Sequence, residues 1–259
     1  MLKPHPTPSI NIVKLGGSII NPDGKYDLAA IARFINITKN SKDQFIFVVG
    51  GGKLCRFIQT TSKPFLEQAL HHEDAVSLAN DELGIAVTKI NARFIRERFE
   101  QALDKKSTSN KQVHPEILLD PTHKIQSTAR IFVACGWKPG CSTDHDMMLL
   151  ANAFNATRVF KISNFPIVKD ISPSKLAKLS SVDQQKALAN AQDLKQITWK
   201  QLNNLVGTNW KAGLNTPFDP QAAQLGLQRA QQLTLYIGQQ EEFFRFMETQ
   251  KFKGTCVKG

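Results

Sequence analysis

The sequence predicts an α/β protein, built as a three-layer α/β/α sandwich around a mainly parallel central sheet. Short apolar runs typical of buried strands alternate along the chain with segments of helical periodicity. Glycines directly follow the first two apolar runs, where a strand would turn into a helix. With 259 residues, 41% of them hydrophobic, the chain can bury a sizeable core, and we expect one domain over residues 1–259.

The first strand is expected over residues 12–15 and ends in Gly16, Gly17 and Ser18. Glycines let a backbone approach a ligand closely, and the unpaired N–H groups of the helix that follows suit an anion. Lys14 stands at the end of the strand, where its ammonium group could reach a phosphoryl group. On these residues alone, a phosphate site and an ordinary strand–turn–helix connection are equally good interpretations.

The second strand is expected over residues 45–49, a continuous apolar run that predicts burial on both faces. It ends in Gly50, Gly51 and Gly52 and leads into a helix from about residue 54 to residue 61. Helices are also predicted over residues 28–37 and 73–103. The second of these carries an apolar stripe, formed by Leu83, Val87, Ile90 and Phe94.

A third strand over residues 130–134 leads into a loop with two glycines and one proline, residues 136–144. The helix that follows has one apolar face, formed by Met147, Leu150, Ala151 and Phe154. Further strands are predicted over residues 157–162, 233–237 and 254–257, and further helices over residues 220–229 and 241–248. The intervening residues 172–205 are polar and carry little core signal. Ligands of such sheets gather at the carboxyl ends of the strands, where the glycine turns and the residue 136–144 loop would meet.

Composition narrows the class of protein. The formal net charge is +11, which could serve nucleic acid or a small anionic substrate. The basic residues are dispersed, however, which argues against nucleic-acid binding as a main role and favours an ordinary solvated basic surface. No run is apolar and long enough to span a membrane, and the first nine residues have no signal-peptide core, so we expect a cytoplasmic protein. None of the four cysteines forms a C-x-x-C pair and the histidines complete no zinc pattern, so the sequence predicts reduced thiols and no protein-held metal.

The sequence contains no P-loop motif and no G-x-S-x-G nucleophile elbow. It does contain glycine turns, a lysine at a strand end and two aspartates on loops, Asp144 and Asp219. Phosphoryl transfer needs amides and cations to hold phosphate oxygens, and carboxylates to position lysines and a magnesium-bound nucleotide.

Five segments together make the chain similar to a known family. They are residues 13–18 (VKLGGS), 48–56 (VVGGGKLCR), 81–92 (DELGIAVTKINA), 139–144 (PGCSTD) with 149–151 (LLA), and, more weakly, 218–223 (FDPQAA). In order and spacing the chain resembles the amino acid kinase family from about residue 10 onward. Within that family it is most similar to uridylate (UMP) kinases of archaeal type.

The resemblance implies transfer of a phosphoryl group from ATP, accompanied by Mg²⁺, to UMP. It implies an acceptor-binding lobe over about residues 1–155, a nucleotide-donor lobe over about residues 156–259, and a homo-oligomer. The residues matched to catalytic positions of the family are Lys14, Asp144 and Asp219. Those matched to ATP-binding positions are Gly16, Gly17, Ser18, Gly52, Arg56, Ser163 and Asn164. Those matched to UMP-binding positions are Gly51, Asp81, Trp137, Pro139, Gly140, Ser142 and Thr143.

Some of these residues also have an ordinary structural interpretation. Asp219 followed by Pro220 is a favourable start for a helix, with the aspartate as N-cap, and Ser142 or Thr143 could likewise be the N-cap of the helix that follows residue 143. Asp81 lies seven residues before Thr88, so a helix would place both on one face.

The donor side departs from the family in residues 163–173. Ser163 and Asn164 preserve a hydroxyl and an amide, but Pro166 and Ile167 stand where the family usually has aspartate and glycine. Proline removes an N–H and isoleucine disfavours a positive φ, so the ATP pocket must be reshaped or lost. Two alternatives therefore remain open: a non-catalytic nucleotide-binding protein with a degenerate ATP site, and a kinase of another small phosphate or carboxylate acceptor.

Overall fold

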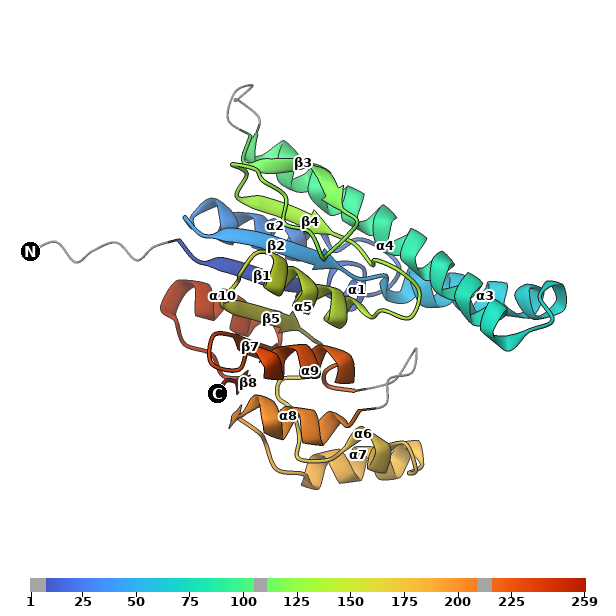
Figure 1. Ribbon diagram of the computed structural model, residues 1–259. Helices are drawn as coiled ribbons and strands as arrows, with labels where there is room; N and C mark the ends of the chain where they lie inside the picture. Colours follow the sequence, from blue (N-terminus) through green and yellow to red (C-terminus); the bar gives the residue numbers. More distant parts are fainter. Residues whose placement is uncertain (1–7, 105–110, 209–215) are drawn as a thin grey trace, which may run out of the picture.

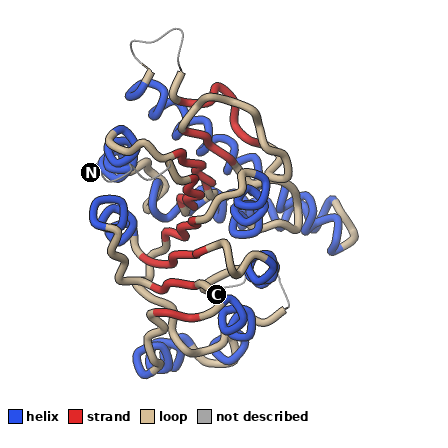
Figure 2. The backbone as a smooth tube through the Cα atoms, turned by 60° about the vertical axis from the view of Figure 1, so that its left-hand side comes forward, coloured by secondary structure: helices blue, strands red, loops and turns tan. Residues whose placement is uncertain are grey.

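In a computed structural model, which describes residues 8–104, 111–208 and 216–259, the chain forms one eight-stranded sheet with helices on both faces (Figures 1 and 2). The strand order is β3-β4-β2-β1-β5-β7-β8-β6, and β7–β8 is the antiparallel pairing in an otherwise parallel sheet. The strands are β1 (Ile10–Leu15), β2 (Gln44–Val49), β3 (Val113–Leu118), β4 (Ile131–Ala134), β5 (Arg158–Ile162), β6 (Gln196–Ile197), β7 (Thr234–Gly238) and β8 (Thr255–Val257). The predicted α/β fold with a mainly parallel sheet is confirmed.

Helices cover both faces of the sheet. The helices of the first half of the chain are α1 (Gly17–Ile20), α2 (Leu28–Lys39), α3 (Gly52–Ala69), α4 (Glu73–Leu103) and α5 (Thr143–Ala153). Those of the second half are α6 (Pro173–Leu176), α7 (Ser181–Asn190), α8 (Trp199–Val206), α9 (Pro220–Gln228) and α10 (Gln240–Thr249). Helices α2, α4 and α10 pack on one face, and α5, α8 and α9 on the other. Helices α3 and α4 extend together past the sheet at the right of Figure 1.

Two hydrophobic cores result from the alternation of side chains along the buried strands. On β1, Ile12 faces the core beneath α5, whereas Val13 faces the core beneath α2 and α4. On β2, Ile46 and Phe47 divide in the same way. A strand that is buried on both faces has no polar side, which is why these strands appear in the sequence as continuous apolar runs.

The predicted helices over residues 28–37 and 73–103 are present as α2 and α4, and α3 is longer than predicted. The predicted apolar stripe of α4 is wrong in part, because Ile90 is 57% exposed. The buried positions of α4 lie about one residue further along, at Gly84, Val87, Thr88, Asn91, Ala92, Ile95 and Phe99. The buried face of α4 was not apparent in the sequence because several of its residues are small or polar. These residues pack near the backbone and the glycine turns, where a large apolar side chain is not needed.

Two other predictions needed correction. Strand β3 was not predicted, since its sequence VHPEIL includes charged, proline and histidine residues that suit an edge strand. The polar residues 172–205 do contribute to the core, because Trp199 and Leu202 of α8 are fully buried. Among the described residues, no helix is long and apolar enough to cross a membrane.

Candidate active site

A cluster of two lysines and one aspartate lies at the carboxyl ends of the central strands. Lys14 of β1 donates a hydrogen bond to Oδ1 of Asp144 at 2.5 Å, and Lys161 of β5 donates to Oδ2 of the same carboxylate at 2.6 Å. The side chains of Lys14, Asp144 and Lys161 are 17%, 6% and 10% exposed, so the cluster is buried but Lys14 still reaches solvent. Each oxygen of Asp144 therefore has its own ammonium partner.

Strand register brings the two lysines together. Strands β1 and β5 are parallel neighbours, and Lys14 lies directly opposite Lys161 in their register. Residues opposite each other in a sheet point to the same face, so both ammonium groups reach the start of α5, which begins next to Asp144. Sequence analysis missed Lys161. The available signal was a charged residue in an apolar strand one position before its end, the place that Lys14 occupies in β1.

The electrostatics of the cluster favour its charged form. Burial acts to raise the pKa of Asp144, but the ammonium groups of Lys14 and Lys161 outweigh burial and hold this pKa below its ordinary value. Burial lowers the pKa of Lys161, which the charge of Asp144 partly offsets. Within the cluster two ammonium groups face the single carboxylate of Asp144, and the neighbouring carboxylate of Asp219 also acts on Lys161. The ammonium groups are the groups that could stabilise a phosphoryl oxygen here.

Asp219 lies beside this cluster and is the N-cap of α9. Its Oδ1 accepts a hydrogen bond from the backbone N–H of Ala222 at 2.9 Å, and its own N–H donates to Oδ2 of Asp144 at 3.3 Å. With Pro220 at the first helical position, the structural interpretation of this aspartate is correct. Its second oxygen, Oδ2, is buried and has no hydrogen-bond partner among the described residues, so this oxygen fits a cation or a hydrogen-bond donor of a ligand.

The two glycine turns touch each other beside Lys14. A Cβ atom at Gly17 would overlap the backbone of Gly52, and Gly52 has a positive φ of 67° that favours glycine. The side-chain amide of Asn91 holds the second turn by donating to the carbonyl oxygens of Gly50 and Gly51, at 2.9 and 3.2 Å. Gly16 and Ser18 lie at the start of α1, which Gly16 caps. The starts of α1 and α3 therefore meet at one place.

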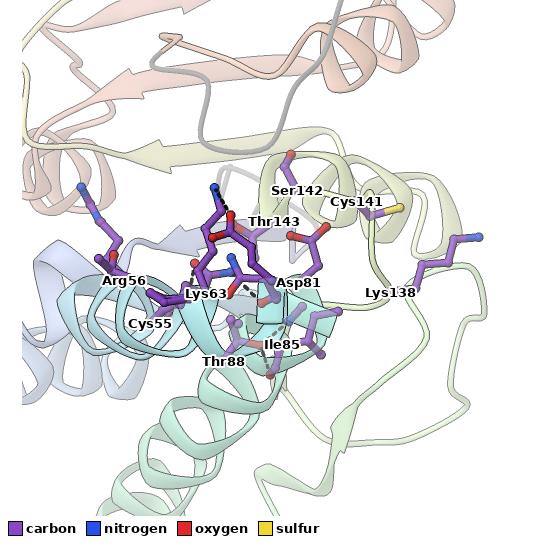
Figure 3. Close-up of a pocket in the computed structure, with 18 residues that line it drawn as sticks. Cys55, Arg56, Lys63, Asp81, Ile85, Thr88, Lys138, Cys141, Ser142 and Thr143 are labelled. Carbon is purple, nitrogen blue, oxygen red and sulfur yellow. Dashed lines mark hydrogen bonds and ion pairs between the residues drawn. The ribbon is translucent and has the colours of Figure 1, made fainter. Parts of the chain in front are cut away.

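A cavity of about 630 Å³ lies between α3, α4 and the start of α5 (Figure 3). Five residues predicted to bind nucleotide line it, namely Gly51, Arg56, Asp81, Ser142 and Thr143. Arg56 lies with the predicted acceptor residues rather than with the other predicted donor residues. The cavity wall also carries the cations Lys63 and Lys138. This mixture of cations with the carboxylates of Glu67 and Asp81 suits an anionic ligand that also bears hydroxyl groups.

Asp81 and Thr88 both line the cavity, as predicted from their seven-residue spacing on α4. Thr88 accepts a hydrogen bond from the N–H of Gly136 at 2.9 Å and so ties the end of β4 to α4. Gly84 also lies on this face, and a Cβ atom there would come within 2.6 Å of the Gln59 side chain. Close packing of α3 on α4 thus explains the glycine within the helix.

The loop before α5 is held from both sides. The carboxylate of Asp81 accepts a hydrogen bond from the N–H of Gly140 at 3.1 Å, and that of Asp146 accepts one from the N–H of Trp137 at 3.2 Å. Ser142 is the N-cap of α5, with its hydroxyl accepting from the N–H of His145. Trp137 and Pro139 belong to this loop but do not line the cavity, whereas Lys138 between them does.

The predicted donor residues Ser163 and Asn164 follow β5. The hydroxyl of Ser163 donates to the carbonyl of Phe165 at 3.1 Å, which turns the chain away from the sheet. Beyond Pro166 the chain is pinned to distant segments: the N–H of Val168 donates to the hydroxyl of Thr255, and Lys169 forms an ion pair with Asp193. A hydrogen bond from the backbone and an ion pair between side chains thus fix the segment after Pro166.

A sequence model of the amino acid kinase family matches residues 9–226. The uridylate kinase of Methanococcus aeolicus is 27% identical over 251 residues, which are 95% of this chain and 98% of that protein. The uridylate kinase of Methanocaldococcus jannaschii is also 27% identical, over 96% of this chain and 99% of that protein.

Solved structures agree on the fold. The uridylate kinase of Archaeoglobus fulgidus superposes with a TM-score of 0.69 at 21% identity, over 95% of this chain and 99% of that one. The UMP kinase of Bacillus anthracis superposes with a TM-score of 0.66 at 16% identity, over 97% of each chain. With the family model spanning most of the chain, this protein belongs to the amino acid kinase family.

Proposed function

We propose that this chain transfers the γ-phosphoryl group of ATP to UMP, giving UDP and ADP. The observation that carries the proposal is the buried Lys14–Asp144–Lys161 cluster, next to a cavity lined by Arg56 and Asp81. A phosphate oxygen of UMP would attack the γ-phosphorus in line, while the bond to the bridging oxygen of ADP breaks. The uridylate kinases that the chain resembles over nearly its whole length support UMP as the acceptor.

Each group in this mechanism has a role that follows from its charge and position. Lys14 stabilises the transferring phosphoryl group because it is the more exposed of the two lysines, and Asp144 holds both lysines in place. The backbone amides at Gly16, Gly17, Ser18 and Gly52 cradle the phosphates of ATP, at the adjoining starts of α1 and α3. The free oxygen of Asp219 would hold the Mg²⁺ that accompanies ATP, where the ion would supply positive charge against the phosphates.

On the acceptor side, Arg56 would hold the UMP phosphate and Asp81 would accept hydrogen bonds from the ribose hydroxyls. Gly51, Ser142 and Thr143 would complete the cavity wall, and the loop that contains Trp137, Pro139 and Gly140 would frame the base. The lobe of about residues 1–155 would thus bind the acceptor. The lobe of about residues 156–259 would bind the donor, in part through Ser163 and Asn164. Because both substrates are cytoplasmic nucleotides, the proposal includes a cytoplasmic location.

A coupled assay with UMP and Mg-ATP tests the proposal. Lys14→Met is expected to lower kcat by about 10²–10³-fold, the loss typical of removing one oxyanion-stabilising group, while UMP binding is retained. Lys111→Met is the matched control, since Lys111 is an exposed lysine in a loose ion pair with Glu100 at 3.9 Å, and it should keep wild-type turnover. No turnover by the wild-type chain above the level of Lys14→Met would refute the proposal.

Residues 163–173 depart from the family, so binding of ATP and binding of UMP must each be measured. Calorimetry measures both and separates this proposal from its alternatives. UMP binding without binding of an ATP analogue would support a non-catalytic nucleotide-binding protein. Binding of ATP with no effect of UMP, followed by turnover of another small phosphate or carboxylate in an acceptor panel, would support a kinase with a different acceptor.

We also propose that the protein is a homo-oligomer that associates through α3. This helix buries none of its residues, and its side chains Phe57 and Phe65 are 66% and 73% exposed. Apolar side chains clustered on one exposed helix are typical of an interface. Light scattering after size-exclusion chromatography should give a mass that is a multiple of 28.9 kDa, and Phe57→Glu with Phe65→Glu should reduce it to one chain.

A further inference from the structure

Three side chains with metal-binding atoms converge where the loop after β4 meets α5. They are Cys141, just before the N-cap, and His145 and Asp146 in the first turn of the helix. The sulfur of Cys141, a ring nitrogen of His145 and a carboxylate oxygen of Asp146 all lie within 4.8 Å of one another. A site made of thiolate, imidazole and carboxylate ligands binds zinc-class ions in preference to Mg²⁺.

Two of these side chains have polar atoms that the fold leaves unpaired. Asp146 is fully buried, and its Oδ2 accepts the hydrogen bond from Trp137, whereas its Oδ1 has no partner among the described residues. The Nδ1 atom of His145 is likewise buried and without a partner in the part of the chain that the structure describes. Folded proteins rarely leave buried polar atoms unpaired, because doing so lowers stability, so such atoms point to a ligand that completes them.

Burial affects all three groups. It raises the pKa of the Cys141 thiol and of Asp146, and it lowers the pKa of His145. A divalent cation would have to displace the thiol and carboxyl protons, so the site is indicated by the convergence of the three ligand atoms and by the unpaired Asp146 and His145 atoms.

Local electrostatics also oppose a cation at this position. The first turn of α5 is the positive end of the helix dipole, which weakly disfavours a cation. Lys14 and Lys138 add to this, and Asp144 and Asp219 act against it. Coordination by sulfur, nitrogen and oxygen is much stronger than the effect of a helix dipole, so the three ligands together can outweigh it.

We propose that Cys141, His145 and Asp146 bind one divalent cation of the zinc class, with a fourth position left for water. Sequence analysis did not detect the site, because its spacing is C-x₃-H-D and one ligand is a carboxylate. The ion would link the loop of residues 136–142 to α5. Because Cys141 also lines the cavity, the ion would stiffen the cavity wall at this loop.

Cobalt titration of the full chain, first dialysed against a chelator, tests the proposal. One equivalent of Co²⁺ should bind and give a thiolate-to-cobalt charge-transfer band with tetrahedral visible bands, and Zn²⁺ should displace it. Cys141→Ser should abolish the charge-transfer band, while His145→Ala and Asp146→Asn should weaken cobalt binding by more than about tenfold.

Cys256→Ser is the matched control, because Cys256 is another half-buried free thiol, on β8, and this variant should bind cobalt as the wild type does. Circular dichroism confirms that each variant is folded, and His145→Ala provides the decisive comparison if Cys141→Ser does not fold. Absence of the charge-transfer band in the wild type, or a band unchanged in His145→Ala, would overturn the proposal. Neither cobalt binding nor the charge-transfer band depends on kinase activity, so the proposed reaction can fail without affecting this result.

Discussion

At the scale of single residues, Asp144 does more than any other side chain to hold the candidate active site together. It accepts hydrogen bonds from Lys14, from Lys161 and from the N–H of Asp219, which come from three separate segments of the chain. A buried carboxylate with two cationic partners is stable only as a complete set, because removing one member leaves uncompensated charge in a poorly solvated place.

We therefore expect Asp144→Asn to destabilise the protein by about 3–5 kcal/mol, since Lys14 and Lys161 would then face each other without a counterion. The matched control is Asp23→Asn, which makes the same change in the ion pair of Asp23 with Lys53, where both side chains are exposed. Urea unfolding followed by circular dichroism should show a large fall in the midpoint for the first variant and little change for the second. Equal effects would mean that burial of the cluster does not matter.

His114 of β3 makes stability depend on pH. Its ring stacks on Phe132 with centroids 5.1 Å apart, and burial lowers its pKa below 6.5, an effect that Glu116 partly offsets. A histidine with a lowered folded-state pKa stabilises the fold fully above its unfolded pKa. This contribution is lost as the pH falls through the folded value.

We expect the contribution of His114 to the free energy of unfolding to be lost as the pH falls from about 7.5 to about 5, so over this range the wild type should lose stability relative to His114→Phe, which keeps the stack. The difference should be small because the ring is only partly buried. Urea midpoints of both proteins at several pH values measure it. Parallel pH profiles for the two proteins would contradict the assignment to His114.

The sequence was informative about residues whose role is local. Lys14 could be predicted because its strand and the glycine turn that follows lie within residues 10–17, close together in the sequence. Lys161 could not, because its role depends on the pairing of β1 with β5, which are separated by more than 140 residues. The contact of Gly17 with Gly52 is non-local in the same sense, although each turn was predicted by itself.

At the scale of elements, the packing of α8 against α9 shows how a polar segment can hide a core contribution. The sequence WKQLNNLV of α8 has a polar face, and only Trp199, Leu202 and Val206 are buried. The helix start is nevertheless encoded locally, by a capping box between Thr198 and Gln201. This capping box was the signal in the sequence that could have located α8.

Trp199 packs directly on the backbone of α9 at Gly226, where an added Cβ would overlap the indole ring. We expect Gly226→Ala to destabilise the protein by about 1–3 kcal/mol, because the buried ring must move and its hydrogen bond to the carbonyl of Leu233 must adjust. Gln224→Ala, an exposed position on the same helix, should be neutral or slightly stabilising. Thermal unfolding, together with tryptophan fluorescence, reports both effects, and a neutral Gly226→Ala would show that α8 is not tightly packed.

At the scale of the whole molecule, the alternation of strands and helices predicts the fold class but not the strand order. Each strand–helix unit along the chain could add its strand on either side of β1, and long-range packing decides which side it takes. The last strand, β8, illustrates the limit: it lies between β7 and β6, inside the sheet, and reverses direction relative to β7. Three residues at the end of the sequence gave no indication of an interior position.

This topology makes the end of the chain part of the core of the second half. Val257 of β8 is fully buried, and the N–H of its neighbour Lys258 donates to the carbonyl of Ile197 on β6. A charge at residue 257 would therefore lie among apolar side chains, whereas the side chain at residue 258 points to solvent.

We expect Val257→Asp to cost more than about 4 kcal/mol, because an unpaired carboxylate would be buried where β6, β7 and β8 meet. Lys258→Asp introduces the same group one residue further on and should leave the unfolding midpoint close to that of the wild type. Hydrogen exchange should show, in Val257→Asp, faster exchange of β6, β7 and β8 than of β1 and β2. Uniform loss of protection over the whole sheet would instead mean that the eight strands unfold as one cooperative unit.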